Sequence, residues 1–137
     1  MLVTIRWMSE NYNKYNNLYF GGKLPVIEFK ISRSKKTWGY AEYKFSRSKN
    51  TVRATSITMS NYYDAPEDVK LTTLLHEMIH VEDYTLNPHH FVRNGQKCHY
   101  DAHGWWFRKE AARLKKYGWD IQQHVTAGEK SQACAPV

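Results

Sequence analysis

The sequence is poor in cysteine, with only Cys98 and Cys134 among its 137 residues. Two cysteines cannot build a disulfide framework, which excludes the class of small secreted proteins that are stabilised by several disulfide bonds. No apolar run approaches the length of about 20 residues that a membrane-spanning helix needs. Residues 1–12 also lack the charged and then apolar layout of a secretory signal. We therefore expect an intracellular, cytoplasmic protein with no membrane partner.

Acidic residues are scarce as well: the 13 Asp and Glu residues are outnumbered by 20 Lys and Arg residues, which gives a net charge of +7. A basic domain attracts polyanions, of which nucleic acid is the commonest, although a merely soluble basic protein is the alternative. Aromatic residues make up 15% of the chain and could supply base stacking, but most of their rings are expected in the core. The length suits one compact domain, which we expect to be monomeric.

The spacing of apolar residues predicts an α+β fold in one domain, residues 1–125, followed by a flexible tail, residues 126–137. The predicted elements are a helix over 4–19, strands over 26–32, 37–45 and 51–60, and helices over 65–84 and 102–117. Short turns join consecutive strands, so we expect hairpins and a three-stranded antiparallel sheet.

Residues 74–80 read LLHEMIH, which places an H-E-x-x-H pattern inside a predicted helix. Positions i and i+4 share one helix face, so His76 and His80 can hold one metal ion between them. Glu77 lies beside the pair, where it can accept a proton from water that a metal activates. The alternative, two chance histidines on a solvated face, is disfavoured by the adjacent apolar stripe. That stripe anchors the helix and consists of Leu71, Leu74, Leu75, Met78 and Ile79.

A catalytic zinc needs three protein ligands and one open position, so a third ligand must come from elsewhere in the chain. The metzincin extension is excluded, because Asp83 and Leu86 stand where its glycine and third histidine would be. His103, at the start of the next predicted helix, is the preferred third ligand, and Glu110 is the alternative. Asp101 could orient a ligand histidine or cap that helix through its side chain.

The segment over residues 86–100 is long and polar, which is typical of a functional lid or a disordered insertion. It contains His89, His90, Cys98 and His99. Because their spacing fits no standard zinc pattern, we interpret them as solvated loop residues.

Basic residues gather in and beside the two predicted turns of the sheet. They are Arg33, Lys35, Lys36, Lys44, Arg47, Lys49 and Arg53. They could form a phosphate-contacting rim next to the active site, or be ordinary solvated turn residues. Trp105 and Trp106 could line the site or stack on bases, or belong to the core.

Several segments together resemble the SprT-like zinc metallopeptidases, the group that includes Spartan. The segments are 17–25 (NLYFGGKLP), 38–40 (WGY), 74–80 (LLHEMIH) and 101–104 (DAHG) with Phe107. They are similar to the family's first helix end, second-strand signature, active-site helix and third-ligand segment, and the resemblance covers residues 12–117. The chain departs from many members in having no C-x-x-C pairs, so we expect it to lack their C-terminal zinc ribbon.

The resemblance implies a small zincin-like minimal protease domain with one catalytic Zn²⁺. By this similarity His76, His80 and His103 hold the ion, and Glu77 is the general base. The implied function is a zinc-dependent endopeptidase that acts on DNA-bound or DNA-crosslinked proteins, in the repair of such crosslinks, with single- or double-stranded DNA left open. Two alternatives remain: a DNA-binding module with a structural zinc and no turnover, and a general intracellular metallopeptidase independent of DNA. Glu77 disfavours the first, because a structural site needs no base.

Overall fold

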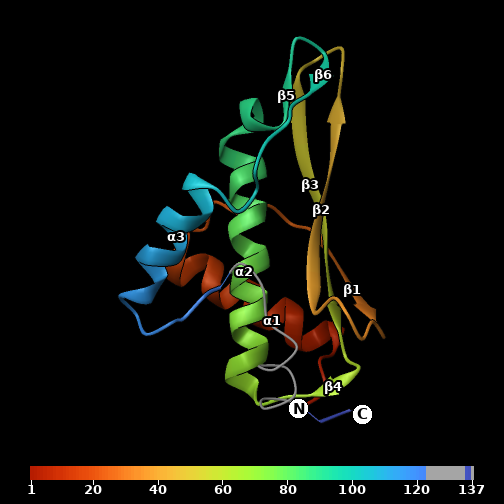
Figure 1. Ribbon diagram of the computed structural model, residues 1–137, viewed down its shortest axis with the longest axis vertical. Coiled ribbons are helices and arrows are strands. Elements are labelled where there is room, and N and C mark those ends of the chain that lie inside the picture. Colours follow the sequence, from red (N-terminus) through yellow and green to blue (C-terminus); the bar gives the residue numbers. More distant parts are fainter. Residues whose placement is uncertain (123–134, 137) are drawn as a thin grey trace.

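The computed structural model describes residues 1–122 and 135–136 (Figure 1). Its helices are α1 (Ile5–Tyr19), α2 (Glu67–Leu86) and α3 (Trp105–Lys115), with a 3-10 turn η1 (Pro88–His90). Its strands are β1 (Glu28–Ser32), β2 (Gly39–Ser46), β3 (Thr51–Ser60), β4 (Tyr63–Asp64), β5 (Val92–Arg93), β6 (Gln96–Lys97) and β7 (Ala135–Pro136). The predicted α+β class is confirmed. Of the predicted tail, only β7 falls among the described residues, where it pairs antiparallel with β4.

Helix α2 lies between the main sheet and α3, and it contacts β2, β3, α1 and α3 (Figure 1). The apolar stripe predicted for this helix is the centre of the core: Leu74, Leu75, Met78 and Ile79 have no exposed surface. Burial of four such side chains anchors the helix strongly, since each contributes roughly 1.5–3 kcal/mol. In the described part of the chain, no helix has the length and apolar character to cross a membrane.

The main sheet is mixed rather than antiparallel. Its order is β1-β3-β2, in which β3 pairs antiparallel with β2 and parallel with β1. The predicted β2–β3 hairpin is confirmed, but the predicted β1–β2 hairpin is wrong.

The error comes from the polar connection over residues 33–38, which crosses the end of β3 instead of making a tight turn. There Asn61 N–H donates to the Ser32 carbonyl (3.0 Å) and Ser60 N–H to the Trp38 carbonyl (2.9 Å). The connection therefore spans about two strand spacings, roughly 10 Å, and leaves room for β3 in the middle.

The segment between α2 and α3 is folded, in contrast to the predicted loop. It forms η1 and the β5–β6 hairpin, which lies beside the β2–β3 turn (Figure 1). The interpretation as solvated loop residues is wrong for His90, which is only 8% exposed. The two residues after it, Phe91 and Val92, are buried and draw the segment onto the body of the protein.

Strand β2 passes close to α2 at Gly39. A Cβ at this position would lie 3.1 Å from the Thr58 carbonyl oxygen, 3.2 Å from Thr73 Cγ2 and 3.5 Å from Glu77 Cγ. The missing side chain thus permits the spacing between the strand and the helix that carries the H-E-x-x-H sequence. The register irregularity of the β2–β3 pair lies further along, between Glu42 and Tyr43.

Replacing Gly39 by Ala should destabilise the protein, because the added methyl would push β2 away from Thr73 on α2. Overpacking of this kind costs about 1–3 kcal/mol. Urea unfolding measures the change, and the double variant with Thr73→Ser, which removes the facing methyl, should recover part of it. A Gly39→Ala protein as stable as the wild type would show that this close approach is unimportant.

Candidate metal centre

Three imidazoles converge on one point between α2 and α3. The Nε2 atoms of His76, His80 and His103 lie 3.2 Å apart in all three pairs. His76 and His80 come from successive turns of α2, as predicted. His103 lies in the turn that precedes α3, not in the first turn of that helix. Within the described residues, these three histidines form a group close enough to hold a metal ion.

The triangle of nitrogens has the size of a tetrahedral zinc site. Zinc lies about 2.0–2.1 Å from each imidazole nitrogen, which separates the nitrogens of a tetrahedral site by roughly 3.4 Å. Burial, helped by the two neighbouring imidazoles, lowers the pKa of His80 to about 3. His80 is therefore neutral at physiological pH, which is the form that binds a metal. These donors fit a divalent cation that prefers nitrogen ligands, as zinc does.

Two hydrogen bonds orient the candidate ligands. His76 Nδ1 lies 2.7 Å from the Gln122 carbonyl oxygen, which can only accept, so Nδ1 carries the proton and Nε2 has a free lone pair. The Asp101 carboxylate accepts from the backbone N–H of His103 (3.0 Å). Helix α3 has Gly104 as its N-cap without a side-chain bond, so Asp101 caps the ligand-bearing turn instead of the helix.

The ring of Phe107 packs against all three imidazoles. Its ring centroid lies 4.7 Å from that of His76, 5.3 Å from His80 and 5.0 Å from His103. Phe107 is 1% exposed and comes from the first turn of α3. A buried ring thus packs against all three candidate ligands and limits their movement.

Glu77 lies beside the triangle and is nearly inaccessible. Its side chain is 6% exposed, with Oε2 3.8 Å from His76 Nε2. Burial raises the pKa of Glu77 to about 8, while a backbone hydrogen bond from Ala41 on β2 opposes the shift. A buried carboxyl next to a candidate metal position is suited to proton transfer.

The alternative third ligand, Glu110, is engaged elsewhere. Its two carboxylate oxygens accept from Arg113, at 2.9 Å and 3.2 Å. It also neighbours Glu82 of α2, whose pKa is raised to about 9 because the side chain is buried and interacts with Glu110. The geometry therefore favours His103 as the third donor.

Asp83 is a residue of the site region whose role the sequence analysis missed. It is 1% exposed and accepts from Tyr100 Oη (2.6 Å), His90 Nδ1 (2.8 Å) and Asn87 Nδ2 (2.8 Å). It therefore ties the segment leading to the third histidine onto α2. One signal was present: Asp83 follows His76 by seven residues and so continues the same helix face.

The predicted basic rim is divided between the two ends of the sheet. Arg33, Lys35 and Lys36 lie in the connection at the end of β3. Arg47 and Lys49 lie in the β2–β3 turn at the opposite end. Lys44 and Arg53 face each other across β2 and β3, next to that turn. The seven residues therefore do not form one surface.

Comparison with known proteins agrees with this geometry. The model of the SprT-like family matches residues 8–127, a range that contains the three histidines and Glu77. The comparison with curated proteins gave no match.

Replacing Glu77 by Gln should stabilise the metal-free protein at alkaline pH. With a folded-state pKa of about 8 against an ordinary 4.5, the folded protein keeps a proton that the unfolded chain releases. Stability therefore falls as pH rises between these two values. Gln has no such penalty, so chelator-treated Glu77→Gln should unfold with a free energy higher by on the order of 4 kcal/mol at pH 8, and with a far smaller difference at pH 5.

The matched control for this measurement is Glu28→Gln, the same chemical change at an exposed position on β1. Its stability difference from the wild type should not vary between the two pH values. A Glu77→Gln difference that is equally flat would contradict the burial of an ionisable group in the site.

Proposed function

The chain belongs to the SprT-like family, and on this premise we propose that it is a zinc-dependent endopeptidase for proteins bound or crosslinked to DNA. The observation that carries the peptidase assignment is the triangle of three imidazole nitrogens, 3.2 Å apart, with a buried carboxyl beside it. The net charge of +7 supports DNA as the molecule to which the substrate protein is bound or crosslinked.

Each residue of the site has a defined task in this proposal. Zinc, when bound, supplies Lewis-acid activation of water and polarisation of the scissile carbonyl. His76, His80 and His103 hold the ion and leave one position open for water or substrate. Glu77 accepts a proton from the attacking water and returns it to the leaving amine. The ionised form of its carboxyl, which a base requires, is favoured next to a cation.

A binding module with a purely structural zinc fits the site less well. A structural zinc is normally closed by four protein ligands, whereas the group formed by the described residues has three members. A structural site also has no use for a buried carboxyl such as Glu77, whose burial is costly.

The test is hydrolysis of a DNA-bound protein by metal-quantified enzyme, with and without the DNA. Glu77→Gln should retain zinc and lose about 100-fold or more of the rate, because general acid–base catalysis typically contributes that much. Glu28→Gln, which makes the same change on an exposed strand, should cleave like the wild type.

Each other result has a clear meaning. Glu77→Gln that cleaves as fast as the wild type would disprove its role as the base. No cleavage by the wild type in either condition would favour the binding module. Cleavage that does not depend on DNA would favour a general peptidase.

A further inference from the structure

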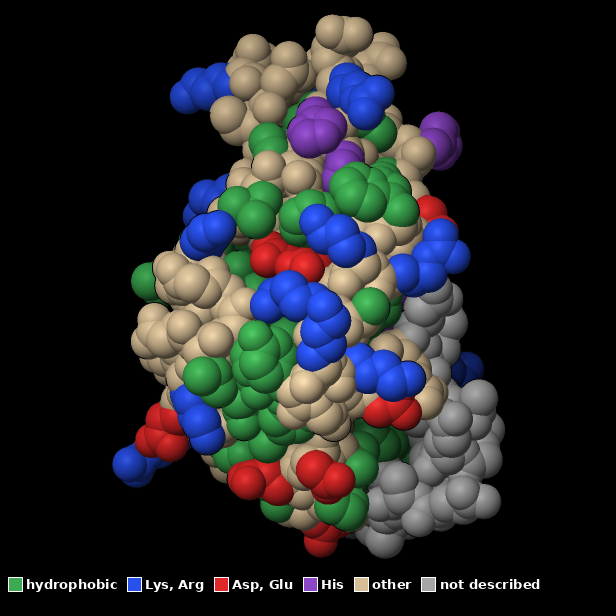
Figure 2. Space-filling view, turned by 90° about the vertical axis from the view of Figure 1, so that its left-hand side faces the viewer, with side chains coloured by type: hydrophobic (Ala, Val, Ile, Leu, Met, Phe, Trp, Pro, Cys, Tyr) green, Lys and Arg blue, Asp and Glu red, His purple; other side chains and the backbone are tan. Residues whose placement is uncertain are grey.

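One end of the molecule carries positive charge without any acidic residue. This basic end consists of residues 43–55 and 89–99, in the β2–β3 turn with its flanking strands and in the β5–β6 hairpin. It holds six exposed cationic side chains: Lys44, Arg47, Lys49, Arg53, Arg93 and Lys97. Among the described residues, no ion pair joins any of them to a carboxylate. In Figure 2 the uppermost part of the molecule shows Lys, Arg and His side chains and no Asp or Glu.

Specific contacts hold the two segments of the basic end together. The backbone N–H of Gly95, at the hairpin tip, donates to Asn50 Oδ1 in the β2–β3 turn (2.7 Å). Gly95 has φ +74° and approaches the Arg47 carbonyl so closely that a Cβ would lie 3.1 Å from it. Lys97 Nζ lies 5.9 Å from the centre of the Tyr43 ring on β2. Cations that are far apart in the sequence thus share one surface.

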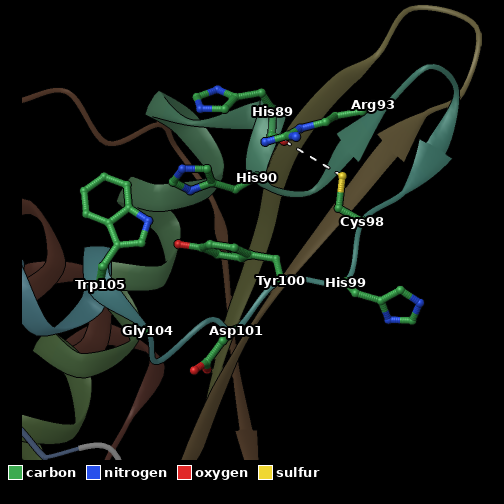
Figure 3. Close-up of a pocket in the computed structure, with 9 residues that line it drawn as sticks. All are labelled: His89, His90, Arg93, Cys98, His99, Tyr100, Asp101, Gly104 and Trp105. Carbon is green, nitrogen blue, oxygen red and sulfur yellow. Dashed lines mark hydrogen bonds between the residues drawn. The ribbon is translucent and has the colours of Figure 1, made fainter.

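A pocket of about 430 Å³ lies between this end and the candidate metal centre (Figure 3). Its size is within the range of about 300–1,000 Å³ that is typical of small-ligand sites. The lining consists of His89, His90, Arg93, Cys98, His99, Tyr100, Asp101, Gly104 and Trp105. Arg93 and the three histidines belong to the basic end, whereas Asp101 and Gly104 flank the third candidate metal ligand, His103.

The pocket presents aromatic surface. Trp105 is 57% exposed, although an indole of this size normally lies in the core or at an interface. The rings of His90 and Tyr100 stack with centroids 4.5 Å apart, and the edge of Trp105 faces His90 at 5.7 Å. Asp101 is the one carboxylate in the lining, and it is engaged by the backbone N–H of His103.

We propose that the basic end and this pocket form a binding site for single-stranded DNA, in which Lys and Arg contact phosphates and Trp105 stacks on one unpaired base. Exposed cations combined with an accessible aromatic ring are the features that single strands require. Bases in a duplex are already stacked on each other and cannot reach an indole in a pocket. A strand bound here runs beside His103, so a protein attached to it would lie near the metal centre; this last consequence rests on the proposed peptidase function.

The test is fluorescence anisotropy with a labelled 15-mer of deoxythymidine, using the full chain with Glu77→Gln as parent to prevent self-cleavage. Lys49→Glu/Lys97→Glu changes the basic end, and Lys35→Glu/Lys36→Glu makes the same change of charge at the other end of the sheet. The first pair should weaken binding tenfold or more and reduce the slope of log affinity against log salt by about 1.4, since each phosphate contact contributes about 0.7. The second pair should change both far less.

The pocket is tested with Trp105→Ala, which should weaken binding of the 15-mer by about tenfold or more without changing the salt slope, because stacking is not an ionic interaction. Trp105→Phe keeps a stacking ring and should recover most of the affinity. A duplex of the same length should be unaffected by either change. Melting temperatures of all variants confirm that they are folded.

Two results would overturn the inference: equal losses for the two charge pairs, or a Trp105→Ala protein that binds like its parent. Hydrolysis of an unfolded protein by chains that retain Glu77 separates this inference from the proposed function. Binding without hydrolysis contradicts the peptidase assignment and leaves the DNA site standing. Hydrolysis without binding of the single strand contradicts the DNA site alone.

Discussion

Three imidazole nitrogens held 3.2 Å apart are the constraint on which the rest of the site depends. Nitrogens that meet in this way direct their lone pairs at one point, where the lone pairs repel each other. A cation at that point is attracted to all three and removes this repulsion. The surrounding structure is built to keep them together. The Gln122 carbonyl fixes the tautomer of His76, and Phe107 packs against all three rings.

Helix α2 joins this site to the core. One face buries Leu74, Leu75, Met78 and Ile79 completely, and the neighbouring face carries the two histidines and Asp83. Glu77 lies where α2 meets β2, close to Gly39 and within hydrogen-bonding reach of the Ala41 backbone. The packing of α2 therefore also positions the candidate catalytic groups, because a shift of the helix would move the histidines and the carboxyl together.

Local patterns in the sequence predicted the parts of the structure that depend on neighbouring residues. The H-E-x-x-H helix and its apolar stripe follow from spacing alone. His103 was identified because a catalytic metal needs a third ligand and this histidine stands at the start of the next predicted helix. The pairing of β1 was mispredicted, since a parallel partner is chosen by packing between distant segments and not by turn length. The burial of His90 was missed because Phe91 and Val92 form only a very short apolar run, and because the sequence does not show that His90 bonds to Asp83. Sequence could not place the basic residues either, since it does not show which turns share an end of the sheet.

Zinc K-edge X-ray absorption on the purified, metal-quantified protein tests the central claim most directly. A site formed by His76, His80 and His103 predicts one zinc per chain, with three imidazole scatterers and one further light atom at about 2.0 Å. A sulfur scatterer at about 2.3 Å, or fewer than three imidazoles, would contradict it.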